Sequence, residues 1–230
     1  KNQDELTSLV SEYVIGDIED LSLQKRLNIS KAKEIYLFTN KDKVNINTAL
    51  VLRSENIVVR VEDLEMIHLF KDRLRIRSVH EENALRLVNS SDLLHKSKIV
   101  LYGFGRFGQN ILRQLILNPD SLLKELVIVD SKIMIQWEHF KHQFNMDYEF
   151  SFTLIEKDQL DYSVLNNISQ KMNIDENCSI VLSINYADYT NIKTANVFRK
   201  NHKDSSIYIR SSGSLIEDEI SRTSDIVIFS

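Results

Sequence analysis

The chain has 230 residues, of which 43% are hydrophobic, so it can bury a core large enough for one or two domains. Its 29 basic and 33 acidic residues give a formal net charge of −4, which argues against a nucleic-acid or anionic-lipid surface. The single cysteine, Cys178, has no partner for an intrachain disulfide, and this fits a reducing, cytosolic setting.

The first ninety residues alternate between helices and strands. Apolar spacing predicts helices over residues 5–12, 21–27, 45–53 and 64–71 and strands over 13–15, 34–38 and 57–61. This alternation indicates a parallel sheet that is covered on both faces. The run Arg73–Arg77 is interpreted as a solvated basic edge, and the apolar stripe that follows, Leu85–Leu94, as packing between two units.

A glycine-rich motif follows the apolar run Ile99–Tyr102. Gly103, Gly105 and Gly108 form a G-x-G-x-x-G cluster, and apolar residues recur behind it at helical spacing. The pattern predicts a strand, a tight turn and a helix. In such a motif the first glycine permits the turn, the second lets the backbone approach a pyrophosphate, and the third lets the helix pack on the strand. The positive end of the helix dipole then faces the phosphates.

An acidic residue stands where this motif requires one. The next apolar run ends on Asp130, and the fingerprint places an acid at the end of the second strand, about 20 residues past the glycines, to bind a ribose 2′-OH. Asp130 favours NAD(H) or an adenosine nucleotide over NADP, whose 2′-phosphate it would repel, and Lys132 softens this exclusion. The alternative is a unit that keeps its glycines for packing and binds no nucleotide.

The rest of the chain completes a nucleotide-binding fold. Further helices are predicted over residues 135–144, 162–172, 188–199 and 215–220, and further strands over 150–155, 180–184, 207–209 and 226–229. No apolar run approaches the ~18 to 20 residues of a membrane span, and the N-terminus lacks a signal-peptide pattern. The sequence does not begin with Met, so we expect these residues to belong to a longer protein.

Two segments of the chain are related. Residues 45–53 (NINTALVLR) and 191–199 (NIKTANVFR) agree at six of nine positions, at an offset of 191 − 45 = 146. Each follows a buried strand and precedes a strand that carries an arginine, Arg60 or Arg210. We therefore predict an α/β protein with two tandem Rossmann-like units. The offset places the first glycine loop at 103 − 146 = −43, so the first unit, 1–90, is truncated at its N-terminal side and the second, 97–230, is complete.

The first unit resembles a known family. Gly16–Asp20 (GDIED), residues 27–42 (LNISKAKEIYLFTNKD), Asn45–Leu50 and Ile57–Asp63 together look like the later half of a TrkA-N or RCK (regulator of potassium conductance) domain. The glycine loop with Asp130 resembles the front half of a second such domain, although no Gly-Asp pair follows its third strand.

The resemblance implies a cytosolic module at the inner face of the cell membrane that regulates a potassium channel or transporter. It implies binding of NAD(H) or ADP/ATP at the carboxyl ends of the strands, pairing with other copies, and attachment to a pore or transporter subunit. Gating would follow from a ligand that binds one arrangement of the paired domains better than the other. Arg106 would neutralise phosphates, and Asn185 would reach the ligand. The predicted nucleotide-binding residues are Gly103, Gly105, Arg106, Phe107, Gly108, Asp130, Ser131 and Asn185.

Two other functions stay open at this stage. One is an NAD-dependent oxidoreductase whose substrate-binding part lies outside these residues, and the other is a Rossmann scaffold that binds no nucleotide. Tyr186 lies near the expected crevice but has no lysine four residues on, so it does not form a common proton relay, and we expect no catalysis. His139 and His142 lie three residues apart without a carboxylate that completes a metal-ligand set, so we also expect no metal site.

Overall fold

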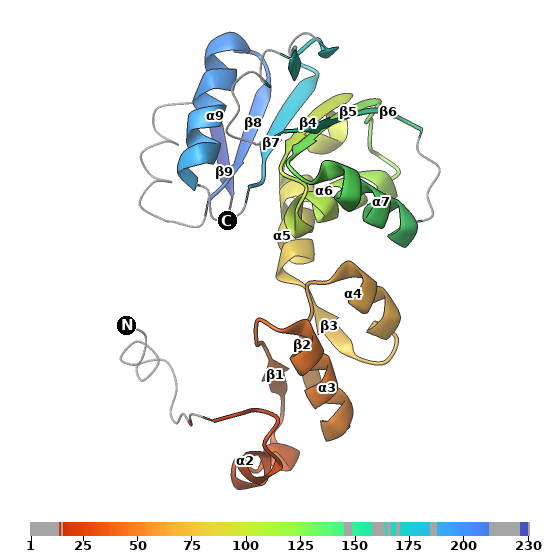
Figure 1. Cartoon of the computed structure of the whole chain (residues 1–230), viewed down its shortest axis with the longest axis vertical. Coiled ribbons are helices and arrows are strands. Elements are labelled where there is room, and N and C mark those ends of the chain that lie inside the picture. The colour runs from red at the N-terminus through yellow and green to blue at the C-terminus, as the bar shows by residue number, and fades with distance from the viewer. Residues whose placement is uncertain are drawn as a thin grey trace. The chain divides into compact units, whose positions relative to one another are not determined.

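The computed structural model describes residues 14, 16–144, 149–157, 164, 167–168, 171–184, 188–211 and 226–229. The chain divides into two compact units, Lys1–Arg77 and Ser78–Ser230. The predicted helices over 5–12 and 215–220, and most of the strand over 13–15 and of the helix over 162–172, lie outside the described residues. Both units are built of strands joined by helices (Figure 1), so the predicted α/β class is confirmed.

The described part of the first unit is a small parallel sheet with its helices. Its elements are α2 (Leu21–Arg26), η1 (Ile29–Lys31), β1 (Ile35–Leu37), α3 (Asp42–Leu52), β2 (Ile57–Arg60), α4 (Leu64–Phe70) and β3 (Arg75–Arg77). The strand order is β1-β2-β3, and both pairings are parallel. The basic run interpreted as a solvated edge is partly a strand, because Ile76 pairs with Val59 while Arg75 stays exposed and binds Glu34 at 2.8 Å.

The second unit has a six-stranded parallel sheet. The helices whose bounds are described are α5 (Val79–Ser90), η2 (Leu93–His95), α6 (Arg106–Leu117), α7 (Ile133–Gln143) and α9 (Asp188–Asn201). Its strands are β4 (Lys98–Tyr102), β5 (Glu125–Asp130), β6 (Ser151–Glu156), β7 (Cys178–Leu182), β8 (Ser206–Arg210) and β9 (Ile226–Phe229). The spatial order is β6-β5-β4-β7-β8-β9, the doubly wound order whose direction reverses between β4 and β7.

Two apolar cores lie on the two faces of this sheet, and β4 contributes to both. Ile99 and Leu101 belong to the cluster that includes residues of α5, α6 and α7, whereas Val100 and Tyr102 belong to the cluster with α9. The strands are therefore continuous apolar runs, as expected for a sheet covered on both faces. The stripe interpreted as packing between the units contributes Leu87, Val88 and Leu93 to the core of the second unit itself.

The repeated segments make the same contact in both units. In the first unit the Asn45 amide donates from Nδ2 to the carbonyl oxygens of Thr39 and Arg60, at 2.9 Å each. In the second unit Asn191 Nδ2 donates to the carbonyl oxygens of Ile184 and Arg210, at 3.0 Å each. Each asparagine is fully buried and joins the residues that follow one strand to the end of the next. We refer to this contact as the asparagine clamp.

A polar cluster joins η2 to β8 in the second unit. The Asp92 carboxylate accepts hydrogen bonds from the Tyr208 hydroxyl and from Ser206 Oγ at 2.9 Å, and it pairs with Lys96 Nζ at 3.0 Å. Burial raises the pKa of Asp92, but the hydrogen bonds from Tyr208, Lys96 and Ser206 together lower it by more than burial raises it. The pKa of Asp92 therefore lies below the usual range. Burial and the bond to Asp92 together raise the pKa of Tyr208 to about 12.

Tyr208→Phe is expected to lower the free energy of unfolding by about 1 kcal/mol at pH 7, because it removes one bond to a partly exposed carboxylate. The folded-state pKa of Asp92 is depressed below its ordinary 3.8. The stabilisation of the fold by ionised Asp92 is therefore fully present above pH 3.8 and is lost as the pH falls through the folded-state pKa. Urea unfolding at pH 7 and pH 3 measures this difference. An equal difference between Tyr208→Phe and the unaltered chain at both pH values would contradict the assignment.

Candidate functional site

The site lies where the strand order of the second unit reverses. β4 ends at Tyr102, and Gly103 turns the chain towards α6 with a φ of +97°, a backbone conformation that L side chains rarely adopt. The Gly103 N–H donates to the Val129 carbonyl of β5 at 2.8 Å. On the other side Ser183, just past β7, donates from Oγ to the Gly103 carbonyl at 2.7 Å. The loop is thus held by both strands that flank β4.

The three glycines of the motif have different surroundings. A Cβ on Gly108 would lie 2.3 Å from the carbonyl oxygen of Gly103, and a Cβ on Gly103 would lie 3.1 Å from the backbone nitrogen of Ile184. Among the described residues, a Cβ on Gly105 would meet no atom within 4 Å. Gly103 and Gly108 are therefore required by close packing, whereas no described residue crowds Gly105. This is the division of roles that a backbone approaching a phosphate needs.

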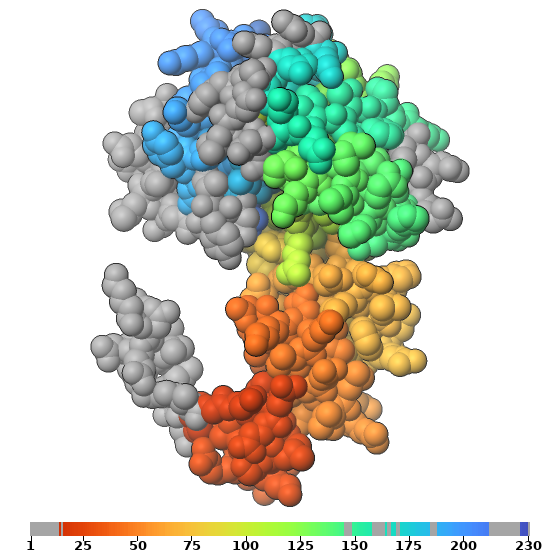
Figure 2. All heavy atoms as spheres, viewed as in Figure 1, coloured from red at the N-terminus to blue at the C-terminus, as the bar shows by residue number. Residues whose placement is uncertain are grey.

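The N-terminus of α6 lies at this glycine. Gly105 is the N-cap of α6, and among the described residues no side chain caps the helix there. Gly105 and Arg106 are exposed, and Figure 2 shows the yellow-green stretch around them at the surface of the second unit. The backbone N–H groups and positive dipole end of the first turn of α6 make this region suited to an anion.

Phe107 contributes a buried side chain to this region. Its ring is 3% exposed and stacks on Phe229 at a centroid distance of 5.3 Å. The guanidinium carbon of Arg210 lies 4.9 Å from the centroid of the same ring. Phe107 was predicted to bind the nucleotide, and its packing leaves the main chain as the part that can contact a ligand.

Asp130 braces the glycine loop from the end of β5. Its Oδ2 accepts a hydrogen bond from the backbone N–H of Phe104 at 2.8 Å, and its Oδ1 accepts one from the backbone N–H of Lys132 at 2.9 Å. The side chain is 7% exposed. Each carboxylate oxygen can accept more than one bond, so this role is compatible with the predicted ribose contact. Ser131, which follows Asp130, is exposed, and Asn185 lies outside the described residues.

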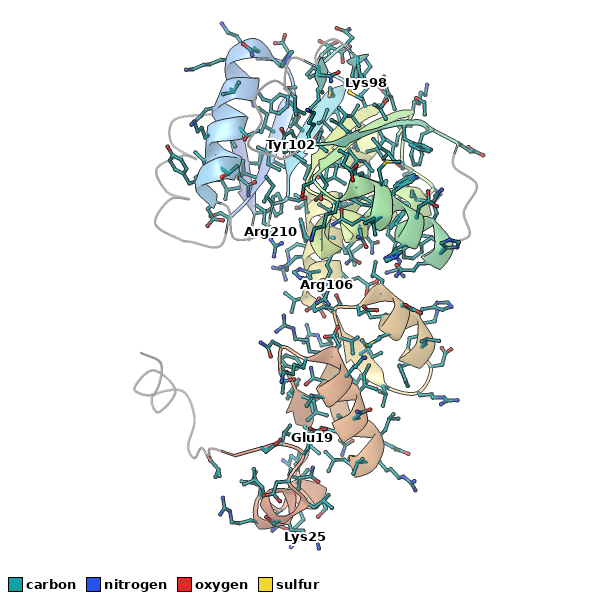
Figure 3. All side chains as sticks on the ribbon, viewed as in Figure 1. Glu19, Lys25, Lys98, Tyr102, Arg106 and Arg210 are labelled. Carbon is teal, nitrogen blue, oxygen red and sulfur yellow. The ribbon has the colours of Figure 1, made fainter. Side chains whose placement is uncertain are left out.

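Sequence reasoning missed two residues of this region. Ser183 carries no motif signal, because a serine after a strand is common, and its role depends on a loop 80 positions away. Arg210 was noted as part of the repeat but not as a site residue. Figure 3 shows Arg210 and Arg106 towards the same end of the second unit, and Lys98 at the opposite end.

Other reactive groups offer little chemistry within the described ranges. No cluster of three or more His, Cys, Asp or Glu side chains there could hold a metal ion. Burial raises the pKa of Cys178 to about 12, so its thiol stays protonated and unreactive at neutral pH. Across the same described ranges, no helix is both long enough and apolar enough to span a bilayer.

Comparison with known proteins shows what the first unit and the whole fold are similar to. Residues 1–80 match the family model of the TrkA-N domain. A solved structure described as GsuK bound to ADP shares the fold over 98% of this chain, with 18% sequence identity and a TM-score of 0.63. A second, described as the GsuK RCK domain, does so with 14% identity and a TM-score of 0.60. This chain spans 57% and 66% of the length of those two chains.

No curated protein sequence matches the chain. The TrkA-N match covers the segments in which the resemblance was recognised, and the solved structures extend the shared fold over both units. The resemblance to TrkA-N and RCK domains is therefore confirmed.

Proposed function

We propose that the chain is a regulatory module of potassium transport that senses an adenine nucleotide, ADP/ATP or NAD(H), at the glycine loop of its second unit. The observation that carries this proposal is Gly105, at the N-terminus of α6 and at the reversal of strand order, where no described residue caps the helix and a Cβ would meet no described atom within 4 Å. The TrkA-N match over residues 1–80 and the fold shared with an RCK domain support the regulatory role. The fold shared with an ADP-bound structure supports the ligand class.

The residues of the site have distinct tasks in this proposal. The first turn of α6 holds the phosphates through its N–H groups, and exposed Arg106 adds positive charge beside them. Asp130 accepts a bond from the ribose while it holds the Phe104 N–H. A ligand that contacts both groups therefore connects the end of β5 to the loop after β4.

Regulation follows if the ligand binds one arrangement of the domains better than another. The ligand can shift that equilibrium by no more than its difference in affinity for the two arrangements. We propose that copies of the chain assemble and act on a membrane pore or transporter subunit from the cytoplasmic side. The module itself carries out no chemical reaction.

Gly105→Ala is the sharpest test of the site. The φ of Gly105 is −66°, and a Cβ there would meet no atom of the described residues within 4 Å, so the variant is expected to fold with unchanged stability. The added methyl group fills the space that a phosphate needs. A ligand at a hundredfold excess over its dissociation constant stabilises the folded state by about 2.7 kcal/mol. Thermal unfolding with ADP, ATP, NAD and NADH should show this stabilisation for the unaltered chain and not for Gly105→Ala.

The matched control is Asn201→Ala. Asn201 is exposed and is the last residue of α9, so this variant should respond to nucleotides as the unaltered chain does. If Gly105→Ala keeps the full nucleotide response, the ligand binds elsewhere. If no nucleotide stabilises the unaltered chain after any co-purified ligand has been removed, the glycines serve packing alone and the chain is a scaffold.

A further inference from the structure

We infer that Gln109 and Ser183 are positioning residues of the nucleotide site. Each donates a hydrogen bond to a backbone carbonyl of the glycine loop, and together they turn the carbonyl oxygens of Gly103 and Phe104 away from the proposed place of the phosphates. This inference rests on the proposed function and concerns the same site. It explains how the loop offers N–H groups, and not oxygen atoms, to an anion.

The peptide between Gly103 and Phe104 is held at both of its ends. Ser183 Oγ donates to the Gly103 carbonyl at 2.7 Å, and the Phe104 N–H donates to Asp130 Oδ2 at 2.8 Å. The C=O and N–H of a trans peptide lie in one plane and point in opposite directions. Two side chains, one at the end of β5 and one just past β7, therefore fix this plane. A reversed peptide would turn the Gly103 oxygen towards the Asp130 carboxylate, which would repel it.

The Gly103 oxygen lies on the buried side of the loop. It is the atom that a Cβ on Gly108 would meet at 2.3 Å, so it lies between α6 and Ser183. Gly103, Gly108 and Ser183 are all buried, whereas Gly105 and Arg106 are exposed. The loop thus has an inner half that is fixed by the protein and an outer half that a ligand can approach.

The next peptide, between Phe104 and Gly105, is oriented by Gln109. The Gln109 side chain donates from Nε2 to the Phe104 carbonyl at 3.0 Å, and its own backbone N–H donates to the Gly105 carbonyl at 3.0 Å. The Phe104 carbonyl is thereby turned towards α6, so the Gly105 N–H of the same peptide points the other way. The Phe104 ring is fully buried against Trp137 and Phe140 of α7, which holds the residue that joins the two peptides.

The orientation of these two peptides determines how the loop interacts with a phosphate. A carbonyl oxygen carries partial negative charge and repels a phosphate, whereas successive backbone N–H groups attract it. With both carbonyl oxygens bound by side chains, the Gly105 N–H joins the N–H groups of the first turn of α6 as a donor for the anion. A loop that already has this shape loses less conformational freedom on binding. Gln109 and Ser183 therefore raise the affinity for phosphate through the backbone that they hold.

Isothermal titration of the chain with ADP and NAD tests the inference, and adenosine, measured by competition, serves as the ligand without phosphate. Gln109→Met keeps the side-chain length and helix propensity but removes the donor, and Ser183→Ala removes the hydroxyl. Each is expected to weaken ADP and NAD binding by about 3- to 10-fold, the effect of losing one hydrogen bond, and the double variant by about 10- to 100-fold. The affinity for adenosine should change by less than about twofold, because adenosine does not contact the oriented N–H groups.

The matched controls make the same exchanges elsewhere in α6 and β7. Gln114→Met changes another half-buried glutamine of α6. Ser179→Ala changes a fully buried serine of β7 whose Oγ has no hydrogen-bond partner in the part of the chain that the structure describes. Both controls should bind ADP and NAD as the unaltered chain does. Ser183→Thr keeps the hydroxyl and is expected to restore binding to within about twofold.

Unfolding of each variant without ligand checks that it is folded, and Gln109→Met decides alone if Ser183→Ala does not fold. If Gln109→Met weakens adenosine as much as ADP and NAD, or weakens none of them, the side chain serves the fold alone. The inference is then wrong while the proposed site stands. If the unaltered chain binds neither ADP nor NAD, the proposed function fails and the inference fails with it.

Discussion

Gly108→Ala is expected to lower the free energy of unfolding of the second unit by about 3 kcal/mol or more. The new Cβ would lie 2.3 Å from the Gly103 carbonyl oxygen and 3.2 Å from Ser183 Oγ. The carbonyl cannot move away easily, because it accepts the Ser183 hydroxyl bond at 2.7 Å and belongs to a residue whose N–H is held by β5. Relief of the clash would require α6 to shift away from β4, which opens the core between them.

Urea unfolding followed by circular dichroism measures this effect, and Gly105→Ala is the matched control. Both variants add one methyl group to the same motif, three residues apart, but within the described part of the chain the Gly108 methyl group meets protein atoms and the Gly105 methyl group does not. We expect a large loss for Gly108→Ala and a change within about 0.5 kcal/mol for Gly105→Ala. Equal stability of the two variants would show that α6 does not pack on β4 as closely as described.

Asn191→Ala is expected to destabilise the second unit by about 2 to 4 kcal/mol. The amide is fully buried, and its removal leaves the carbonyl oxygens of Ile184 and Arg210 without the bonds that Nδ2 donates to them. A buried polar group that loses its partner costs about 1 to 3 kcal/mol. Asn191→Asp keeps the shape but cannot donate when ionised, so we expect it to be at least as destabilising at pH 7.

The same change in the first unit tests whether the asparagine clamp is a shared device. Asn45→Ala should weaken the first unit to a similar degree, because Asn45 donates to two carbonyl oxygens at 2.9 Å. Amide hydrogen exchange, which reports on each segment separately, should show loss of protection around β1 and β2 for Asn45→Ala and around β7 and β8 for Asn191→Ala. Full protection in either variant would contradict the role of the clamp in that unit.

Much of this fold could be predicted because apolar periodicity is a local property. The strands around Val100 and Ile128 are long apolar runs, and the helix after Gly105 has its apolar residues on one face, so type and order followed directly from the sequence. The strand Arg75–Arg77 could not be recognised in the same way. It has three residues, two of them charged. It forms a strand because it pairs with β2, where Ile76 lies opposite Val59.

The site was predictable only in part, because some of its contacts join segments that are distant in the sequence. Glycines predict a turn because they have greater conformational freedom than other residues, so the turn at Gly103 could be predicted from the sequence. The contact between Arg210 and Phe107 joins two segments distant in sequence and depends on the strand order, which no short motif encodes. The bond from Phe104 to Asp130 is similar, since a carboxylate expected to face a ligand also supports the loop that would hold that ligand.

The hydroxyl bond from Ser183 to Gly103 has a consequence for the order in which the molecule forms. β4 meets β5 after 125 − 98 = 27 positions, but it meets β7 only after 178 − 98 = 80 positions. Contacts between distant segments form late, because closing a long loop costs conformational entropy. The loop at Gly103 therefore reaches its final shape only when Ser183 has been synthesised and docked. A fragment that ends before Ser183 would lack this support for the loop.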